Sequence, residues 1–147
     1  MGETAMLSHQ PNRRAVVLLV DDEPAVLRMV EAVLANAGFT VLTAADGPEA
    51  LKVSRDYPGA IHLLLTDVVM PEMDGPELAE KLTEERPGMR VLLMSGHSPH
   101  QIPEAFLSRL LQKPFHPQEL LERIRRELPE GQDEDSEEGE RVSTARG

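Results

Sequence analysis

The feature that most constrains the fold is a short apolar stretch, residues 61–65, in which four of the five residues are Ile or Leu. The stretch is too short for a helix of a soluble protein and shows no alternation, which is typical of a strand buried on both faces of a parallel sheet. Asp67 stands just past it, and Pro71 and Gly75 favour a turn-rich path to a helix that starts at Pro76. The pattern predicts a carboxylate at the mouth of a sheet.

Four further short apolar stretches have the length of strands, and helical segments alternate with all five. This alternation indicates an α/β layer fold with right-handed crossovers. Five such units predict a flavodoxin-like, doubly wound, five-stranded parallel sheet in the order 2-1-3-4-5 with five helices. The expected strands are residues 15–20, 39–43, 61–65, 90–94 and 110–112, and the expected helices begin at Pro24, around Pro48, at Pro76, near Pro103 and at Pro117.

Polar side chains follow four of the expected strands. Asp21 and Asp22 follow the first, Asp67 the third, Ser95 the fourth and Lys113 the fifth. Because the carboxyl ends of neighbouring parallel strands meet in one crevice, we expect three acids, a hydroxyl and an ammonium around one site. Crowded carboxylates repel one another unless a cation lies among them. Oxygen ligands in a small open site favour magnesium as that cation.

Length and composition indicate a single domain with loose ends. A chain of 147 residues is too short for two ordinary domains, so we expect a folded unit over residues 14–129, a flexible leader over 1–13 and a disordered tail over 130–147 with seven acids. The net charge of −11 argues against direct binding of nucleic acid. With no cysteine, no signal pattern and no apolar run long enough for a membrane span, the protein is expected to be soluble and cytoplasmic.

Four motifs, at the expected strand ends and in this order, resemble the receiver domain of bacterial two-component response regulators, and the resemblance covers about residues 14–128. The motifs are Asp21-Asp22, residues 66–75, Ser95-Gly96 and Lys113-Pro114-Phe115. The resemblance implies a phosphorylatable switch that takes a phosphoryl group from a histidine kinase or histidine phosphotransfer protein and signals to a downstream protein. It implies that Asp67 is the phosphoacceptor, that Lys113 and Ser95 assist, and that magnesium is held by Asp21, Asp22, Asp67 and the backbone carbonyl of Val69.

The chemistry of these residue types agrees with the implied roles. A carboxylate that attacks phosphorus forms an acyl phosphate, and Asp67 is the implied nucleophile. Phosphoryl transfer depends mainly on positioning and on neutralised charge, which magnesium and Lys113 would supply. The Ser95 hydroxyl would donate a hydrogen bond to a phosphoryl oxygen. The resemblance further implies a cis Lys113–Pro114 bond and a role for Val69 and His97 in the lifetime of the phosphoryl group.

One position departs from the resemblance: receivers usually carry Tyr or Phe three residues before the lysine, and this chain has Leu110. The usual aromatic switch is therefore in doubt, and residues 110–115 look more like receivers attached to hybrid sensor kinases. The domain is expected to act either alone or as the receiver of such a kinase, and to catalyse only its own phosphorylation and dephosphorylation. A phosphatase of the haloacid dehalogenase kind would need a second Asp where Val69 stands, and a docking scaffold without chemistry would not need every site position filled.

Overall fold

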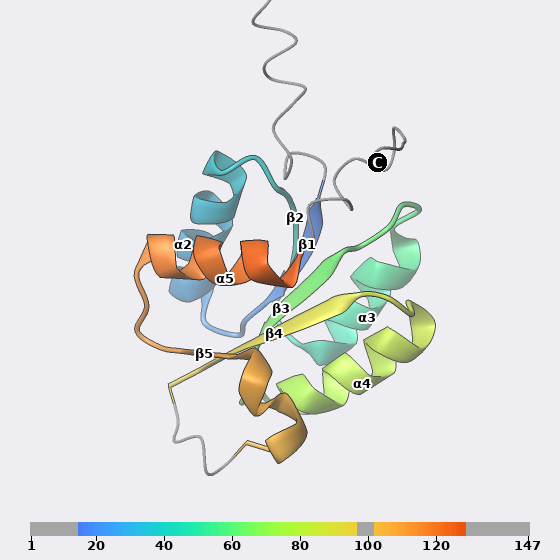
Figure 1. Cartoon of the computed structure of the whole chain (residues 1–147). Coiled ribbons are helices and arrows are strands. Elements are labelled where there is room, and N and C mark those ends of the chain that lie inside the picture. The colour runs from blue at the N-terminus through green and yellow to red at the C-terminus, as the bar shows by residue number, and fades with distance from the viewer. Residues whose placement is uncertain (1–14, 97–101, 129–147) are drawn as a thin grey trace, which may run out of the picture.

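The computed structural model describes residues 15–96 and 102–128 (Figure 1). The expected leader over 1–13 and acidic tail over 130–147 lie outside these residues, as does His97. No helix in the described part of the chain is long and apolar enough to cross a membrane.

The described strands form one parallel sheet. They are β1 (Val16–Val20), β2 (Thr40–Ala44), β3 (Leu63–Asp67), β4 (Arg90–Ser95) and β5 (Leu110–Gln112), in the order β2-β1-β3-β4-β5. This order confirms the expected doubly wound topology, in which the ends of β1, β3, β4 and β5 are contiguous. In register, Leu18 of β1 pairs with Leu42 of β2 and Leu64 of β3.

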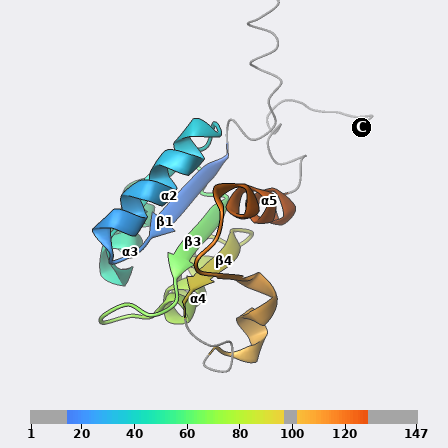
Figure 2. The same cartoon turned by 90° about the vertical axis from the view of Figure 1, so that its left-hand side faces the viewer.

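The helices cover both faces of the sheet. One face carries α2 (Pro24–Asn36) and α5 (Pro117–Glu127), and the other carries α3 (Gly47–Asp56) and α4 (Gly75–Glu85), as Figures 1 and 2 show. The expected short helix near Pro103 is η3 (Glu104–Arg109), a 3₁₀ helix that begins with a bond from the Phe106 N–H to the Pro103 carbonyl at 2.9 Å. It spans only six residues and none of them is buried, so little packing favours a full α-helix there.

Two apolar clusters hold the sheet between these helices. Leu18 and Leu64 belong to the cluster beneath α3 and α4, whereas Leu19 and Leu65 belong to the cluster beneath α2 and α5. Alternate residues of β1 and β3 therefore enter opposite clusters, which confirms that these strands are buried on both faces. Burial of such side chains contributes about 1.5–3 kcal/mol each.

The end of β3 is positioned by the loop that follows it. The N–H of Gly75 donates to the carbonyl of Val68 at 2.7 Å, and a Cβ at Gly75 would collide with the carbonyl oxygen of Asp67. Only glycine allows α4 to begin so close to the strand, and Asp74 caps the helix by accepting the Glu77 N–H at 2.9 Å. Asp67 is itself the last residue of β3, which ends two residues later than the expected strand over 61–65, because β3 remains paired with β4 as far as Asp67 and Met94.

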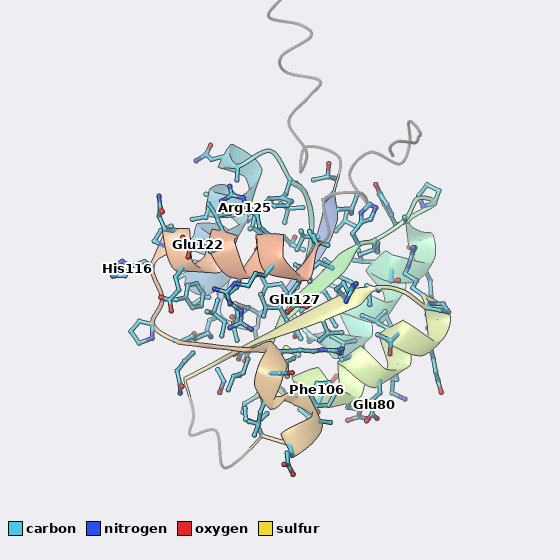
Figure 3. The ribbon with its side chains drawn as sticks, viewed as in Figure 1. Glu80, Phe106, His116, Glu122, Arg125 and Glu127 are labelled. Atoms are coloured by element: carbon cyan, nitrogen blue, oxygen red, sulfur yellow. The ribbon has the colours of Figure 1, made fainter. Side chains whose placement is uncertain are left out.

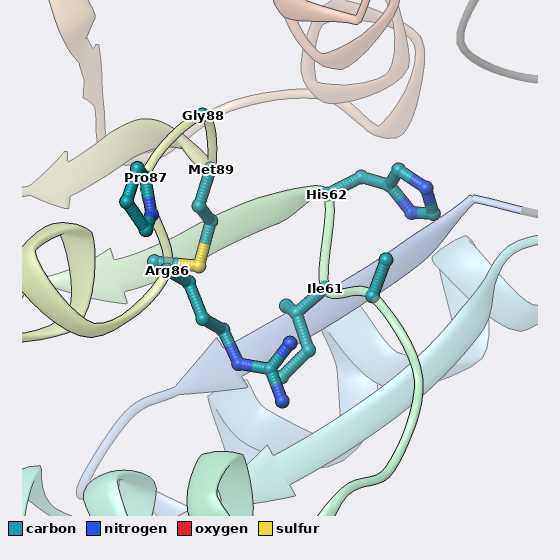
Figure 4. A pocket seen from close by; sticks show the side chains of 7 residues that line it. Ile61, His62, Arg86, Pro87, Gly88 and Met89 are labelled. Atoms are coloured by element: carbon teal, nitrogen blue, oxygen red, sulfur yellow. The ribbon is translucent and has the colours of Figure 1, made fainter.

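Arg86 joins the C-terminal end of α4 to α3 at the opposite end of the sheet. Its guanidinium donates to the Ser54 hydroxyl, the Ser54 carbonyl and the Gly59 carbonyl, each at 2.8 Å, and to the Tyr57 carbonyl at 2.9 Å. A pocket of about 350 Å³ lies beside it between the loops that precede β3 and β4. Figure 4 shows the Arg86 guanidinium beside Ile61, with the His62 ring directed away from it.

Candidate functional site

Three carboxylates meet where β1 and β3 end. Asp21 and Asp22 follow β1, Asp67 ends β3, and one oxygen of each lies within 4.8 Å of the others. Asp21 is buried, Asp67 is half-buried and Asp22 is exposed, so the cluster opens to solvent on one side. The structure therefore brings together the three acids that the sequence predicted at one edge of the sheet.

Asp21 is held in place by backbone groups as well as by side chains. Its N–H donates to the Ala44 carbonyl at 3.2 Å, and its Oδ1 accepts the Glu23 N–H at 2.9 Å. Its Oδ2 accepts from the Lys113 ammonium at 3.3 Å. A buried carboxylate with several donors keeps a fixed orientation, so the Asp21 oxygens have a fixed position in the cluster.

Lys113 reaches this cluster from the edge strand β5. Its Nζ lies 3.0 Å from Asp67 Oδ1 and 3.3 Å from Asp21 Oδ2. Its backbone N–H donates to the Ser95 carbonyl at 2.8 Å, which extends the pairing of β4 and β5 by one residue. The Lys113–Pro114 peptide bond is cis, as the resemblance implied.

Charge is unevenly compensated in the site. Burial disfavours the Lys113 ammonium, but the hydrogen bond and charge of Asp67, together with the charge of Asp21, raise the pKa of Lys113 above its usual value. Burial raises the pKa of Asp67; Lys113 lowers it, and the charges of Asp21 and Asp22 raise it, with a net rise. One ammonium thus does not compensate a half-buried carboxylate with two acidic neighbours. A second cation would relieve this repulsion.

Ser95 and Val69 border Asp67 on neighbouring segments. Asp67 pairs in register with Met94 of β4, so Ser95, buried at the end of β4, is the next residue along the adjacent strand. Val69 lies in the loop two residues beyond Asp67, and its side chain is 51% exposed. Every described residue that the sequence assigned to the site therefore lies at this edge of the sheet.

Two contacts of the site had no counterpart in the sequence reasoning. The Thr66 hydroxyl donates to the Asp67 carbonyl at 3.0 Å, and Asp21 receives the N–H of Glu23 from the first turn after β1. Asp side chains in turns commonly accept the backbone N–H two residues on, so the second contact could have been predicted. The close approach of Gly75 to Asp67 was not predicted either, since the sequence indicated only a turn at Gly75.

The donor set suits a hard divalent cation. All three side chains offer carboxylate oxygens, and none of the described residues adds sulfur or imidazole to the cluster. Such oxygen donors suit Mg²⁺ or Ca²⁺ better than zinc or copper. The structure thus brings acids, an ammonium and a strand-end hydroxyl together at the carboxyl ends of β1, β3, β4 and β5 of a doubly wound parallel sheet.

Comparisons with known proteins identify the family of this chain. The model of the response regulator receiver domain matches residues 17–125. The sensor kinase CckA of Brucella abortus is 37% identical over 81% of this chain and 13% of its own length, and the response regulator receiver protein CpdR of the same organism is 34% identical over 76% of this chain and 95% of its own. A crystal structure of the CheX–CheY–BeF3–Mg²⁺ complex from Borrelia burgdorferi superposes with a TM-score of 0.68 at 29% identity, over 76% of this chain and 87% of that one.

The chain belongs to the response regulator receiver domain family. It is a receiver domain of two-component signal transduction, a class of phosphorylatable switch that works with kinases and downstream targets.

Proposed function

We propose that Asp67 accepts the phosphoryl group in a reaction assisted by Mg²⁺. The observation that carries this proposal is the Lys113 ammonium 3.0 Å from Asp67 Oδ1, in a cluster where Asp21 and Asp22 bring two further carboxylates within 4.8 Å. A lone surface aspartate would have neither neighbour. Asp21, Asp22 and Asp67, with the backbone carbonyl of Val69, would hold the ion.

The residues of the chain divide the chemical work. An oxygen of the Asp67 carboxylate attacks phosphorus, an O–P bond forms, and the P–N bond to the donor histidine breaks, so that an acyl phosphate and free imidazole result. Lys113 stabilises negative charge on the transferring group, and Ser95 donates its hydroxyl proton to a phosphoryl oxygen as a hydrogen bond. Bound Mg²⁺ would supply charge neutralisation and orient the phosphoryl oxygens. Hydrolysis of the acyl phosphate would reset the switch.

The partners and setting are part of the same proposal. The phosphodonor would be a histidine kinase or a histidine phosphotransfer protein, and the readout would be a protein contact in the cytoplasm, without direct binding of nucleic acid or membrane. The domain would turn over no metabolite and would catalyse only its own phosphorylation and dephosphorylation. The similarity to the receiver domain of the hybrid histidine kinase CckA supports a role as part of such a kinase, and the similarity to CpdR supports a role as a single receiver.

The test is labelling with a small phosphodonor. We expect wild-type protein incubated with acetyl phosphate and Mg²⁺ to gain one phosphoryl adduct in the mass spectrum, and Asp67→Asn to gain none, because an amide is a poor nucleophile. Asp56→Asn on α3 is the matched control, since Asp56 is exposed and pairs only with Lys52, at 3.1 Å, among the described ion pairs. Loss of the adduct in wild type on removal of Mg²⁺ would support the metal requirement. An undiminished adduct on Asp67→Asn would refute the proposal.

A further inference from the structure

Arg123 on α5 contacts a segment of the chain that no motif assigned to the site. Its Nη1 donates to the Leu110 carbonyl at 2.9 Å, and its Nη2 donates to the Ser108 carbonyl at 3.2 Å. These carbonyls lie on either side of the junction where η3 ends at Arg109 and β5 begins at Leu110. Figure 3 shows α5, marked by Glu122 and Arg125, above β5, with η3, marked by Phe106, below it.

The strand that Arg123 holds is short, although Leu111 at its centre is buried in the core. β5 has three residues, lies at the edge of the sheet and, among the described strands, pairs only with β4. The Lys113 N–H faces β4, where it donates to the Ser95 carbonyl, and backbone groups alternate in direction along a strand, so the Leu110 carbonyl faces the free edge. Arg123 satisfies this outward carbonyl, which would otherwise lack a partner in the sheet. β5 is thus held by β4 on one side and by α5 on the other.

The guanidinium suits this task better than an ammonium would. Its two terminal nitrogens lie in one plane at a fixed separation and reach two carbonyls at once, whereas a lysine would reach one. Arg123 forms no ion pair with any described residue. Within this part of the chain its guanidinium binds the two carbonyls of the η3–β5 junction instead. Arg126 lies on the same helix but is exposed and makes no such contact with the part of the chain that the structure describes.

We propose that Arg123 is a positioning residue for phosphoryl transfer, which fixes the η3–β5 junction and thereby sets the place of Lys113 beside Asp67. Lys113 directly follows β5 and lies three residues after Leu110. A displacement of Leu110 would therefore also displace the Lys113 ammonium, which contacts Asp67 and Asp21. Arg123 itself touches none of the three carboxylates. The inference rests on the proposed role of Asp67 and Lys113.

The first measurement is the initial rate of acetyl phosphate labelling at saturating Mg²⁺, taken well below the melting temperature of each variant. Arg123→Gln is expected to lower the rate on the order of tenfold, because small displacements of a catalytic group have large kinetic effects. Mg²⁺ affinity should not change. Arg123→Lys should recover part of the rate through one carbonyl, and Arg126→Gln, which removes the same charge from the same helix, should label like wild type. Equal rates in wild type and Arg123→Gln, or an equal loss in Arg126→Gln, would overturn the inference.

A second measurement does not depend on phosphorylation. Hydrogen exchange of the Lys113 amide, which bonds to the Ser95 carbonyl, should be faster in Arg123→Gln than in wild type and unchanged in Arg126→Gln. Unchanged exchange in Arg123→Gln would overturn the inference even if labelling slowed. If the wild-type protein took no label at all, the proposed function would fail. Faster exchange of the Lys113 amide in Arg123→Gln would still show that Arg123 holds β5 in place.

Discussion

Replacement of Arg86 by Met should destabilise the domain strongly without altering the chemistry of the site. Methionine keeps the apolar part of the side chain and removes the guanidinium, which donates four hydrogen bonds to Ser54, Tyr57 and Gly59. These bonds connect the C-terminal ends of α3 and α4 with the loop that leads into β3. They lie at the end of the sheet opposite to Asp67, because β3 runs from Leu63 to Asp67.

The magnitude follows from the two bonds to Ser54. This residue is 1% exposed, so water has little access to the hydroxyl and the carbonyl that would lose their donors. A hydrogen bond to a charged group contributes about 1.5–3 kcal/mol, and two at the lower value amount to about 3 kcal/mol. The contact with Gly59 is exposed and Tyr57 is only partly buried, so water can replace the donors to these two carbonyls and we add nothing for them. A loss of about 3 kcal/mol corresponds to a fall in melting temperature of roughly 12 °C for a domain of this size.

The assay is urea unfolding followed by far-ultraviolet circular dichroism. Arg86→Met should move the midpoint to lower urea without a change in slope, since the surface exposed on unfolding stays similar. Arg86→Lys should lose most of the same stability because an ammonium cannot match the planar fork. Arg90→Met, at an exposed position four residues on, is the control and should stay within about 0.5 kcal/mol of wild type. A loss below about 1 kcal/mol in Arg86→Met, or an equal loss in Arg90→Met, would refute the reasoning.

Two further substitutions test the site and the loop beside it. Asp22→Ala should weaken Mg²⁺ binding on the order of tenfold by calorimetric titration, because a carboxylate ligand is lost, and should leave folding stability nearly unchanged since Asp22 is exposed; unaltered affinity would contradict the assigned ligand. Glu72→Asn should raise the melting temperature by a few degrees, because Glu72 has a φ of 73° and asparagine tolerates this left-handed conformation at a cost lower by about 0.5–1 kcal/mol; an unchanged or lower value would show that Glu72 makes a compensating contact.

The site could be predicted from the sequence because its logic is topological. Once residues 61–65 are recognised as a central parallel strand, the direction of every neighbouring strand follows, and so does the convergence of Asp21, Asp67 and Lys113 at one edge. Prolines and glycines in the sequence indicated where the helices begin. Asp46 caps α3 and Asp74 caps α4, because their side chains accept the N–H groups three residues on. These signals are local, and the structure agrees with them closely.

The guanidinium contacts could not be predicted in this way. Arg86 and Arg123 bind backbone carbonyls, and since every residue offers a carbonyl, no residue type marks the acceptor. Their partners lie 13 to 32 residues away and become neighbours only after the helices have packed. The 3₁₀ form of η3 could not be predicted for a related reason: it depends on how few of its residues are buried against the sheet and not on its sequence pattern.

Leu110 and Arg123 together suggest how this receiver could signal without an aromatic at position 110. The Leu110 side chain is half-buried against the cluster beneath α3 and α4, while its carbonyl is held from α5 at 2.9 Å. The bond from Arg123 to Ser108 in η3 is longer, at 3.2 Å, and exposed, and η3 buries none of its residues. Segments with so little buried surface open at the lowest free energy. If phosphorylation of Asp67 moves Ser95, we therefore expect η3 to separate from Arg123 before β5 does, with the Leu110 bond holding β5 and Lys113 in place.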